Sequence, residues 1–169
     1  MRLGTSSPLS HDSVQEWAAK QKELGCRSLV FPLNCEADDA LIDEYAKEAR
    51  ANDLLIAEVG IWRNAMSLDP DERQRNRDYT VAQLKLADRL GARCAVNVTG
   101  AFGPVWEGGY KANFTPEARK EIVKMIREVI DRAEVSNTYF TVEPMPWMVP
   151  TGPEDYLKLI EEVDREHFA

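Results

Sequence analysis

Two glutamates, Glu58 and Glu143, lie at or near the ends of predicted buried strands, where a carboxylate could act as an acid, a base or a metal ligand. Glu143 follows an apolar run at residues 139–142 and is followed at once by Pro144, and Glu58 lies near the end of another apolar run, residues 54–59. Such a carboxylate must pair with a cation, bind a metal or change its pKa, because ionised groups are costly to bury. Glu143 is therefore a candidate acid, base or metal ligand, and a solvated or Arg-paired strand end is the alternative. For Glu58 the position favours a supporting, structural carboxylate over a catalytic one.

Three tryptophans and an asparagine also follow or end predicted strands. Trp62, Trp106 and Trp147 fall in the segments after strands, where an indole could stack on the apolar face of a sugar or exclude water. The alternative is that these indoles cap the core. We select Trp62, Asn97 and Trp147, together with Glu58, as candidate substrate-binding residues. For Trp106 a lid over the site and an exposed surface residue are equally good interpretations.

The elements that must position these residues alternate regularly along the chain. Strands are predicted to start near residues 2, 28, 54, 93 and 139. Helix start signals follow four of these strands: Asp12 with Gln15 three residues later, Asp69 before Pro70, Thr115 before Pro116, and Gly152 before Pro153. Strands that alternate with helices form a parallel sheet, so an open doubly wound sheet and a piece of a (β/α)8 barrel both remain possible. No Gly-rich phosphate-binding loop follows the first strand.

The two ends of the predicted strands differ in the length of their loops. Active sites of parallel α/β folds lie at the carboxyl ends of the strands. Two long predicted loops, residues 60–69 and 99–114, lie at that end, together with Thr5-Ser6-Ser7. The opposite end has only tight turns, such as residues 24–26. This asymmetry indicates one functional face, at the carboxyl ends of the strands.

Composition and charge exclude several classes of partner. The 169 residues include 21 Lys+Arg and 29 Asp+Glu, which gives a net charge of −8 and argues against nucleic acid or an anionic membrane as partner. No apolar run approaches the roughly 20 residues of a membrane span, and the first ten residues lack the apolar segment of a signal peptide. We therefore expect a cytoplasmic protein whose three cysteines are reduced. His11 and His167 lie away from the carboxyl ends of the predicted strands, so neither is a candidate base or ligand.

Several segments resemble the sugar phosphate isomerase/epimerase family, the xylose isomerase-like group of TIM barrels. The similar segments are Gly4-Thr5-Ser6, Lys22-Glu23-Leu24-Gly25-Cys26, Ala87 to Arg93, Phe140-Thr141-Val142-Glu143-Pro144, Pro150-Thr151-Gly152 and Leu157 to Val163. The resemblance implies that Glu143 is the first ligand of a divalent metal (Mn, Mg, Co or Zn) and one of two acid/base carboxylates. It also implies that the other ligands, an Asp, a His and a second Glu, come from strands six to eight, so that this chain alone should bind no metal tightly. Residues 166–169 are similar to the beginning of the sixth strand.

The resemblance gives the predicted fold and function. The fold class is α/β, a partial (β/α)8 TIM barrel of about five parallel βα units, with residues 1–169 as one domain that stops at the start of strand six. The implied function is metal-dependent proton transfer next to a carbonyl of a ketose or polyol-derived sugar, that is, isomerisation or epimerisation. An inosose dehydratase-like lyase of the same fold and a non-catalytic half-barrel are the alternatives. Five parallel strands leave two open edges, so we expect a homo-oligomer. Because the resemblance places the other metal ligands on strands six to eight, we expect this chain alone to be inactive.

Overall fold

The computed structural model describes residues 1–6 and 10–169, and in this part of the chain five parallel strands alternate with five α-helices. The strands are β1 (Gly4–Thr5), β2 (Ser28–Val30), β3 (Leu55–Gly60), β4 (Cys94–Asn97) and β5 (Tyr139–Val142). The helices are α1 (Val14–Glu23), α2 (Asp39–Ala51), α3 (Pro70–Leu90), α4 (Pro116–Ala133) and α5 (Pro153–Val163), with a short 3-10 helix, η1 (Lys111–Phe114), before α4. Ser7, which the sequence predicts at the rim of the site, lies outside the described residues.

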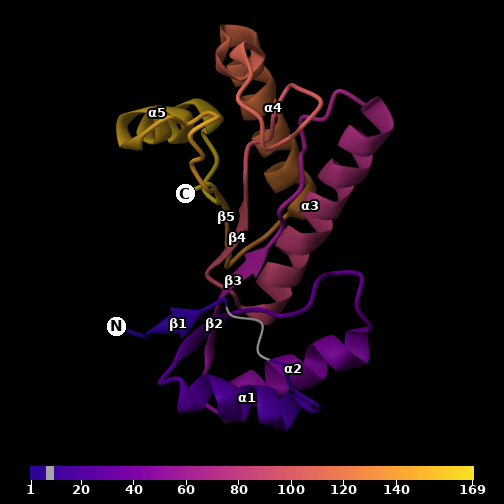
Figure 1. Cartoon of the computed structure of the whole chain (residues 1–169), viewed down its shortest axis with the longest axis vertical. Coiled ribbons are helices and arrows are strands. Elements are labelled where there is room, and N and C mark those ends of the chain that lie inside the picture. The colour runs from indigo at the N-terminus through magenta and orange to yellow at the C-terminus, as the bar shows by residue number, and fades with distance from the viewer. Residues whose placement is uncertain (7–9) are drawn as a thin grey trace.

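The strand order decides between the two architectures that the sequence leaves open. The sheet runs β1-β2-β3-β4-β5, and each neighbouring pair is parallel. In a doubly wound sheet the order of the strands reverses at a switch point, whereas here each strand lies beside the next one in the sequence. The helices follow one another in an arc, from α1 and α2 at the bottom past α3 to α4 and α5 at the top (Figure 1). The fold is therefore a partial barrel, with its helices outside and its inner face uncovered.

The chain returns to the edge of β5 after α5. Phe168 forms an isolated parallel bridge with Phe140. The Phe140 N–H donates to the carbonyl oxygen of His167 at 2.8 Å, and the Ala169 N–H donates to that of Phe140 at 3.2 Å. The bridge lies where the sequence predicts the start of a further strand.

The hydrophobic core lies between the sheet and the helices. Strand residues that face the helices, such as Leu29, Val59, Ala95 and Phe140, have at most 1% of their surface exposed. They pack against the apolar faces of the helices in one continuous cluster. In β4 and β5 the alternate residues Cys94, Val96, Tyr139 and Thr141 face the barrel interior and are not fully buried, as the side-chain alternation of a strand requires. In β3 the register with β2 shifts between Ile56 and Glu58, so that Ile56 and Val59 are both buried.

Side-chain caps set the starts of four helices, α1 to α4, and Asp38 caps α2. Asp69 Oδ1 accepts from the N–H groups of Asp71 and Glu72, and Thr115 Oγ1 accepts from Ala118 N–H, so both predicted caps are confirmed. The predicted cap of α1 was wrong by one residue. Ser13 Oγ accepts from Glu16 N–H at 3.2 Å, and the Glu16 carboxylate accepts from the N–H of Asp12 at 2.7 Å. Ser13 and Glu16 therefore cap this helix, with Glu16 bonding the N–H one residue before the N-cap, and the Asp12-x-x-Gln15 pattern does not.

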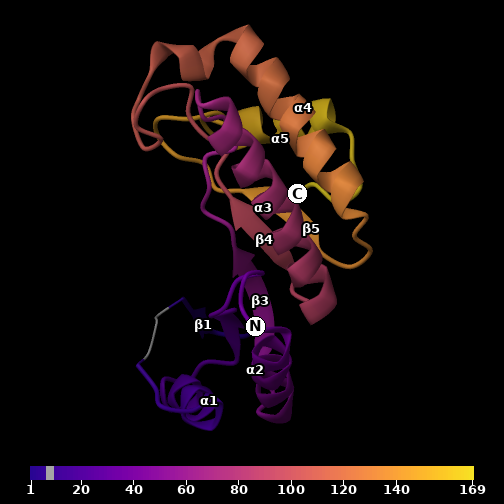
Figure 2. The ribbon, with the colours of Figure 1, turned by 90° about the vertical axis from the view of Figure 1, so that its right-hand side faces the viewer.

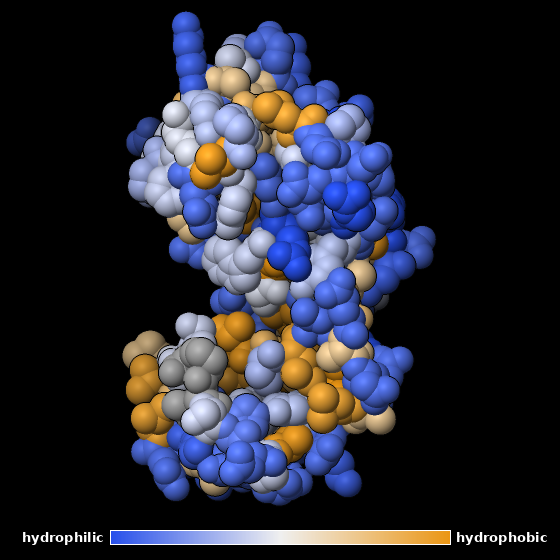
Figure 3. Space-filling view, turned by 45° about the vertical axis from the view of Figure 1, so that its right-hand side comes forward, coloured by the Kyte–Doolittle hydropathy of each residue, from blue (hydrophilic) through white to orange (hydrophobic). Residues whose placement is uncertain are grey.

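The molecule is elongated, with a constriction between two parts of one sheet. The part with β1, β2, α1 and α2 lies below the constriction in Figure 2, and the helices α3 to α5 lie largely above it. Hydrophobic residues are exposed on the lower part beside the constriction (Figure 3). In the described part of the chain, no helix combines the length and the hydropathy needed to cross a membrane.

Candidate functional site

The carboxyl ends of the strands carry three long segments that contact one another. The loops after β3 and β4 lie side by side at the top of the molecule in both ribbon views (Figures 1 and 2). The segment after β5 joins them, since Thr99 Oγ1 donates to the carbonyl oxygen of Val149 at 2.5 Å. The long loops thus form one continuous rim at the end where the sequence predicts the functional face.

Glu143 is the first residue after β5 and is exposed at this rim. Its N–H donates to the carbonyl oxygen of Asn97 at 2.7 Å, which continues the pairing of β4 with β5 beyond Val142. Because Val142 faces the helices and is buried, the alternation of the strand directs Glu143 toward the barrel interior. The fixed backbone therefore holds this carboxylate at the mouth of the barrel.

Glu58 lies on the same inner face, deeper in the barrel. It is inside β3, in register with Cys94 of β4, which is in register with Tyr139 of β5. Glu143 is four residues further along β5 than Tyr139, which places it nearer the rim than Glu58. Burial, and second the negative charge of Glu143, raise the pKa of Glu58 above its ordinary value. The structure therefore brings the two predicted carboxylates within electrostatic range of each other.

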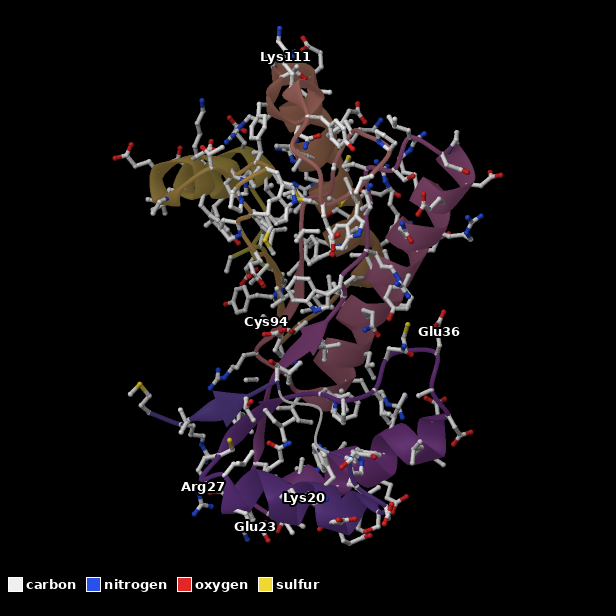
Figure 4. All side chains as sticks on the ribbon, viewed as in Figure 1. Lys20, Glu23, Arg27, Glu36, Cys94 and Lys111 are labelled. Atoms are coloured by element: carbon white, nitrogen blue, oxygen red, sulfur yellow. The ribbon has the colours of Figure 1, made fainter. Side chains whose placement is uncertain are left out.

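Cys94 borders Glu58 on the neighbouring strand. Its Sγ lies 3.6 Å from the carbonyl oxygen of Ala57, and burial, followed by the charge of Glu58, raises the pKa of the thiol. Figure 4 places Cys94 on the sheet, well away from Lys111 at the tip of the loop after β4. The thiol is held neutral at the amino end of its strand, away from the rim.

Trp62 covers the inner face above Glu58. Its backbone has φ +55°, and a Cβ added to Gly60 would come within 2.6 Å of Trp62 Nε1. Gly60 follows the buried Val59 and so faces the barrel interior. The absence of a side chain at Gly60 lets the indole of Trp62, which is 39% exposed, lie against the inner face of β3.

The other two predicted binding residues are more deeply packed. Asn97 has no exposed surface; its Oδ1 accepts from Arg63 N–H at 3.0 Å, and its Nδ2 has no partner among the described residues. Trp147 packs, half-buried, against a small cluster of Val98, Ala101 and Met148, and its buried Nε1 likewise has no partner in the described part of the chain. Both residues shape the rim, and direct contact of either with a substrate stays a prediction.

Two further asparagines hold the rim together, and the sequence pattern did not single them out for this role. Asn64 Nδ2 donates to the carbonyl oxygen of Ala101 at 3.1 Å, and its Oδ1 accepts from the N–H of Ala101 at 3.0 Å. Asn113 Nδ2 donates to the carbonyl oxygen of Trp147 at 2.8 Å, and its Oδ1 accepts from Phe102 N–H. The only feature of the local sequence that could have indicated this role is the presence of each asparagine in a long loop after a parallel strand.

The carboxylates do not make up a metal site on their own. A divalent ion needs about four to six ligands, mostly oxygen or nitrogen. Across residues 1–6 and 10–169, no three His, Cys, Asp or Glu side chains gather closely enough to hold one. Glu143 offers one carboxylate at the rim, and Glu58 lies deeper on the same face. These residues therefore do not fit a resident metal without further ligands.

The sequential strand order and the carboxylates at the strand ends define part of a (β/α)8 barrel. The model of the xylose isomerase-like TIM barrel family matches residues 8–169, and the chain belongs to this family. No curated protein matches the sequence.

Solved structures with this fold are longer than the chain. D-psicose 3-epimerase from Clostridium cellulolyticum H10 has a TM-score of 0.72 and 18% identity, with 99% of this chain and 62% of that chain covered. The probable 3-DHS dehydratase AsbF from Bacillus anthracis has a TM-score of 0.74 and 18% identity, over 99% and 61%. A xylose isomerase-like TIM barrel protein from Mycobacterium smegmatis, in complex with magnesium, has a TM-score of 0.68 and 20% identity, over 93% and 56%. The chain spans less than two thirds of each of these proteins.

Proposed function

We propose that this chain supplies five βα units and one side of the active site of a sugar isomerase or epimerase. The observation that carries the proposal is the placement of Glu143 at the carboxyl end of β5, with Glu58 behind it on the same inner face. Proton transfer next to a carbonyl needs a base at the reacting carbon, and a carboxylate at a barrel mouth can take that role. The substrate class is a ketose or a polyol-derived sugar, as in the epimerase whose fold this chain shares.

In this reaction the carboxylate of Glu143 removes the proton from the carbon next to the carbonyl. The electron pair of the broken C–H bond moves into the carbonyl, which becomes an enediolate. Return of a proton to the opposite face of the same carbon, from a second acid that residues 1–6 and 10–169 do not supply, completes an epimerisation. Return of the proton from Glu143 to the former carbonyl carbon completes an isomerisation. Trp62, whose indole lies against Gly60 on the inner face, would shield the reacting carbon from water.

A divalent metal (Mn, Mg, Co or Zn) belongs to the proposal only where further ligands join Glu143. It would polarise the carbonyl oxygen and stabilise the enediolate. The magnesium complex of a structure with the same fold supports this part of the proposal. The chain alone is expected to bind such an ion weakly and to turn over no sugar.

A chimera tests the role of Glu143. Residues 1–169 are joined to the part of the Clostridium D-psicose 3-epimerase that the chain does not cover, and uptake of solvent deuterium by D-fructose is followed by NMR with Mn²⁺ present. We expect exchange at the carbon next to the carbonyl, with a loss of about 10²–10⁴-fold on Glu143→Gln, the usual contribution of a general base. Glu121→Gln, on the exposed face of α4, is the control and should keep the exchange rate.

Two results would contradict the proposal. One is a chimera that has the circular dichroism of the parent enzyme and binds Mn²⁺, yet exchanges no proton. The other is an active chimera that keeps its rate after Glu143→Gln. Metal-dependent turnover by the 169-residue chain alone would overturn the expectation that it is inactive by itself.

A lyase acting on an inosose or a related hydroxy-ketone is the second candidate. The shared fold of the probable 3-DHS dehydratase favours it, because dehydration also begins with removal of a proton beside a carbonyl. The same chimera distinguishes the two reactions, since loss of water gives a conjugated ketone that absorbs in the ultraviolet and epimerisation does not. A binding or structural half-barrel without catalysis is the third candidate, and a chimera without either activity would favour it.

A further inference from the structure

A cavity lies at the rim, between the loops after β3 and β4 and the start of α3. It has a volume of about 340 Å³, and we call it the rim pocket. Its lining includes the side chains of Trp62, Arg63, Ser67, Glu72, Asn76 and Trp106. Glu58 and Glu143, the residues assigned to proton transfer, do not line it. The rim pocket therefore lies apart from the two carboxylates and shares only Trp62 with the residues named for the proposed reaction.

The rim pocket is built by buried hydrogen bonds. Asn64 joins its two loops through both backbone groups of Ala101, and its own carbonyl oxygen accepts from Asn76 Nδ2 at 2.9 Å. Asn64 also accepts from Met66 N–H at 3.1 Å, which turns the first loop. Gly100 adopts φ +98°, a conformation that favours glycine. These contacts hold the two walls at a fixed separation before any ligand binds.

The polar groups of the rim pocket suit a neutral ligand that both donates and accepts hydrogen bonds. The guanidinium of Arg63 lies 4.8 Å from the ring centroid of Tyr79. None of the ion pairs among the described residues involves Arg63. Glu72 accepts from Ser67 Oγ at 2.5 Å through one oxygen, Oε2, which leaves Oε1 for a ligand. A phosphate or carboxylate would meet Arg63 but would be repelled by Glu72. A ligand with hydroxyl groups can satisfy both side chains.

The apolar groups of the same pocket suit a ring. Trp62 and Trp106 are two of the four tryptophans of the chain, and both line it. An indole offers a flat apolar face, and the C–H face of a pyranose ring is its natural partner. A volume of about 340 Å³ is at the lower end of the range for small-molecule sites, which agrees with one sugar ring.

The rim pocket adjoins the barrel mouth through Trp62, whose indole lies over Gly60 on the inner face and also lines the pocket. We propose that the rim pocket binds a neutral pyranose ring, the glycosyl substituent of a substrate whose reacting sugar lies at the barrel mouth. This inference rests on the proposed function and specifies its substrate class as a glycosylated ketose or keto-sugar.

The test uses the natural chain and a sugar that cannot react. Methyl β-D-glucopyranoside has no ketone, so it cannot react, and the Trp106 variant decides whether it binds in the rim pocket. Titration of the tryptophan fluorescence should give a saturable change, and Trp106→Ala should raise the dissociation constant about tenfold or more through loss of the stacking face. Trp17→Phe is the matched control: Trp17 lies on the buried face of α1, and its replacement should leave the dissociation constant unchanged. Inorganic phosphate should give no saturable change.

Three results would overturn the inference: no saturable change with the glucoside, an unchanged dissociation constant in Trp106→Ala, or phosphate binding that displaces the glucoside. Glu72→Ala is the second variant. It removes a polar group in the first turn of α3, whereas Trp106→Ala removes an indole from the rim. Glu72→Ala should also weaken glucoside binding, and circular dichroism checks that both variants fold. Proton exchange by the chimera with free D-fructose does not require the rim pocket, because free fructose carries no glycosyl substituent. Failure of this inference therefore leaves the proposed function standing.

Discussion

Glu58 is a carboxylate that the fold holds in an unfavourable place. It lies inside β3 on the inner face, and burial, then the charge of Glu143, raises its pKa. The native state therefore holds the proton of Glu58 more tightly than the unfolded chain does. By linkage, the free energy of unfolding falls as the pH rises from the ordinary value of a glutamate, about 4.3, through the raised native value. Glu58 thus lowers the stability of the folded chain at neutral pH.

The variant Glu58→Gln tests this effect. The amide has nearly the same shape and carries no charge, so we expect it to raise the urea midpoint at pH 7. At pH 4 or below, where the wild-type carboxyl is protonated, the gain should disappear. Glu121→Gln, on the exposed face of α4, should change neither midpoint appreciably. A wild-type chain that is more stable than Glu58→Gln at pH 7 would show that Glu58 has a stabilising partner.

At the residue scale, sequence reasoning succeeded where a residue's role follows from its place on a strand. The positions of Glu143 and Trp62 after their strands were sufficient to predict that they lie at the mouth. Asn64 could not be found in this way, because its partner Ala101 is 37 residues away and no local pattern encodes the contact. Asn97 was chosen for its position, and full burial with a bond to Arg63 N–H gives it a role in shaping the loop.

At the scale of elements, one arginine joins two helices of the outer layer. Arg119 of α4 donates to Glu162 at 2.5 Å and to Asp155 at 2.6 Å, both on α5. Burial opposes ionisation of Asp155, but the hydrogen bond from Thr151 N–H and the bond from Arg119 outweigh it and lower its pKa. Because the side chain of Arg119 is only 18% exposed, these bonds are less screened than ordinary surface pairs.

Replacing this arginine should destabilise the chain. Arg119→Met keeps most of the side-chain length, and we expect it to lower the free energy of unfolding by about 2 kcal/mol, as for hydrogen bonds between charged groups. Lys158→Met is the control: Lys158 is 65% exposed and 4.0 Å from Glu162, so its loss should cost less than about 0.5 kcal/mol. Urea unfolding at pH 7 measures both. The loss of unfolding free energy in Arg119→Met should become smaller as the pH falls through the lowered native pKa of Asp155. Equal losses for the two variants would contradict a stabilising role for the ion pairs of Arg119.

Helix limits were predictable because caps are local. Asp69 and Thr115 each bond an N–H two or three residues later, and short-range sequence contains that information. The predicted cap of α1 was wrong because two overlapping capping patterns, at Asp12 and Ser13, compete there. The arrangement of the elements was less accessible. Alternation predicts a parallel sheet, whereas the choice between open sheet and barrel depends on strand order, which only long-range pairing determines.

At the scale of the whole molecule, the sheet has an uncovered inner face and an open edge at β1, a strand of two residues. Edges of this kind promote pairing between chains. Leu3, next to β1, is 67% exposed, and Leu157 on α5 is 63% exposed. The two leucines are therefore equally accessible, but only Leu3 lies at the sheet edge.

We expect the chain to self-associate at micromolar concentration through this edge. Sedimentation velocity should show dimers or larger species, and Leu3→Lys should shift them toward monomer, whereas Leu157→Lys should not. A monomer at all micromolar concentrations, or equal effects of the two lysines, would argue against edge pairing.

The sequential strand order also has a consequence for folding during synthesis on the ribosome. Each strand pairs with the strand synthesised just before it, so no strand waits for a partner that is made much later. A chain that emerges from its N-terminus can therefore add one βα unit at a time. The order of synthesis and the order of assembly therefore coincide in this protein.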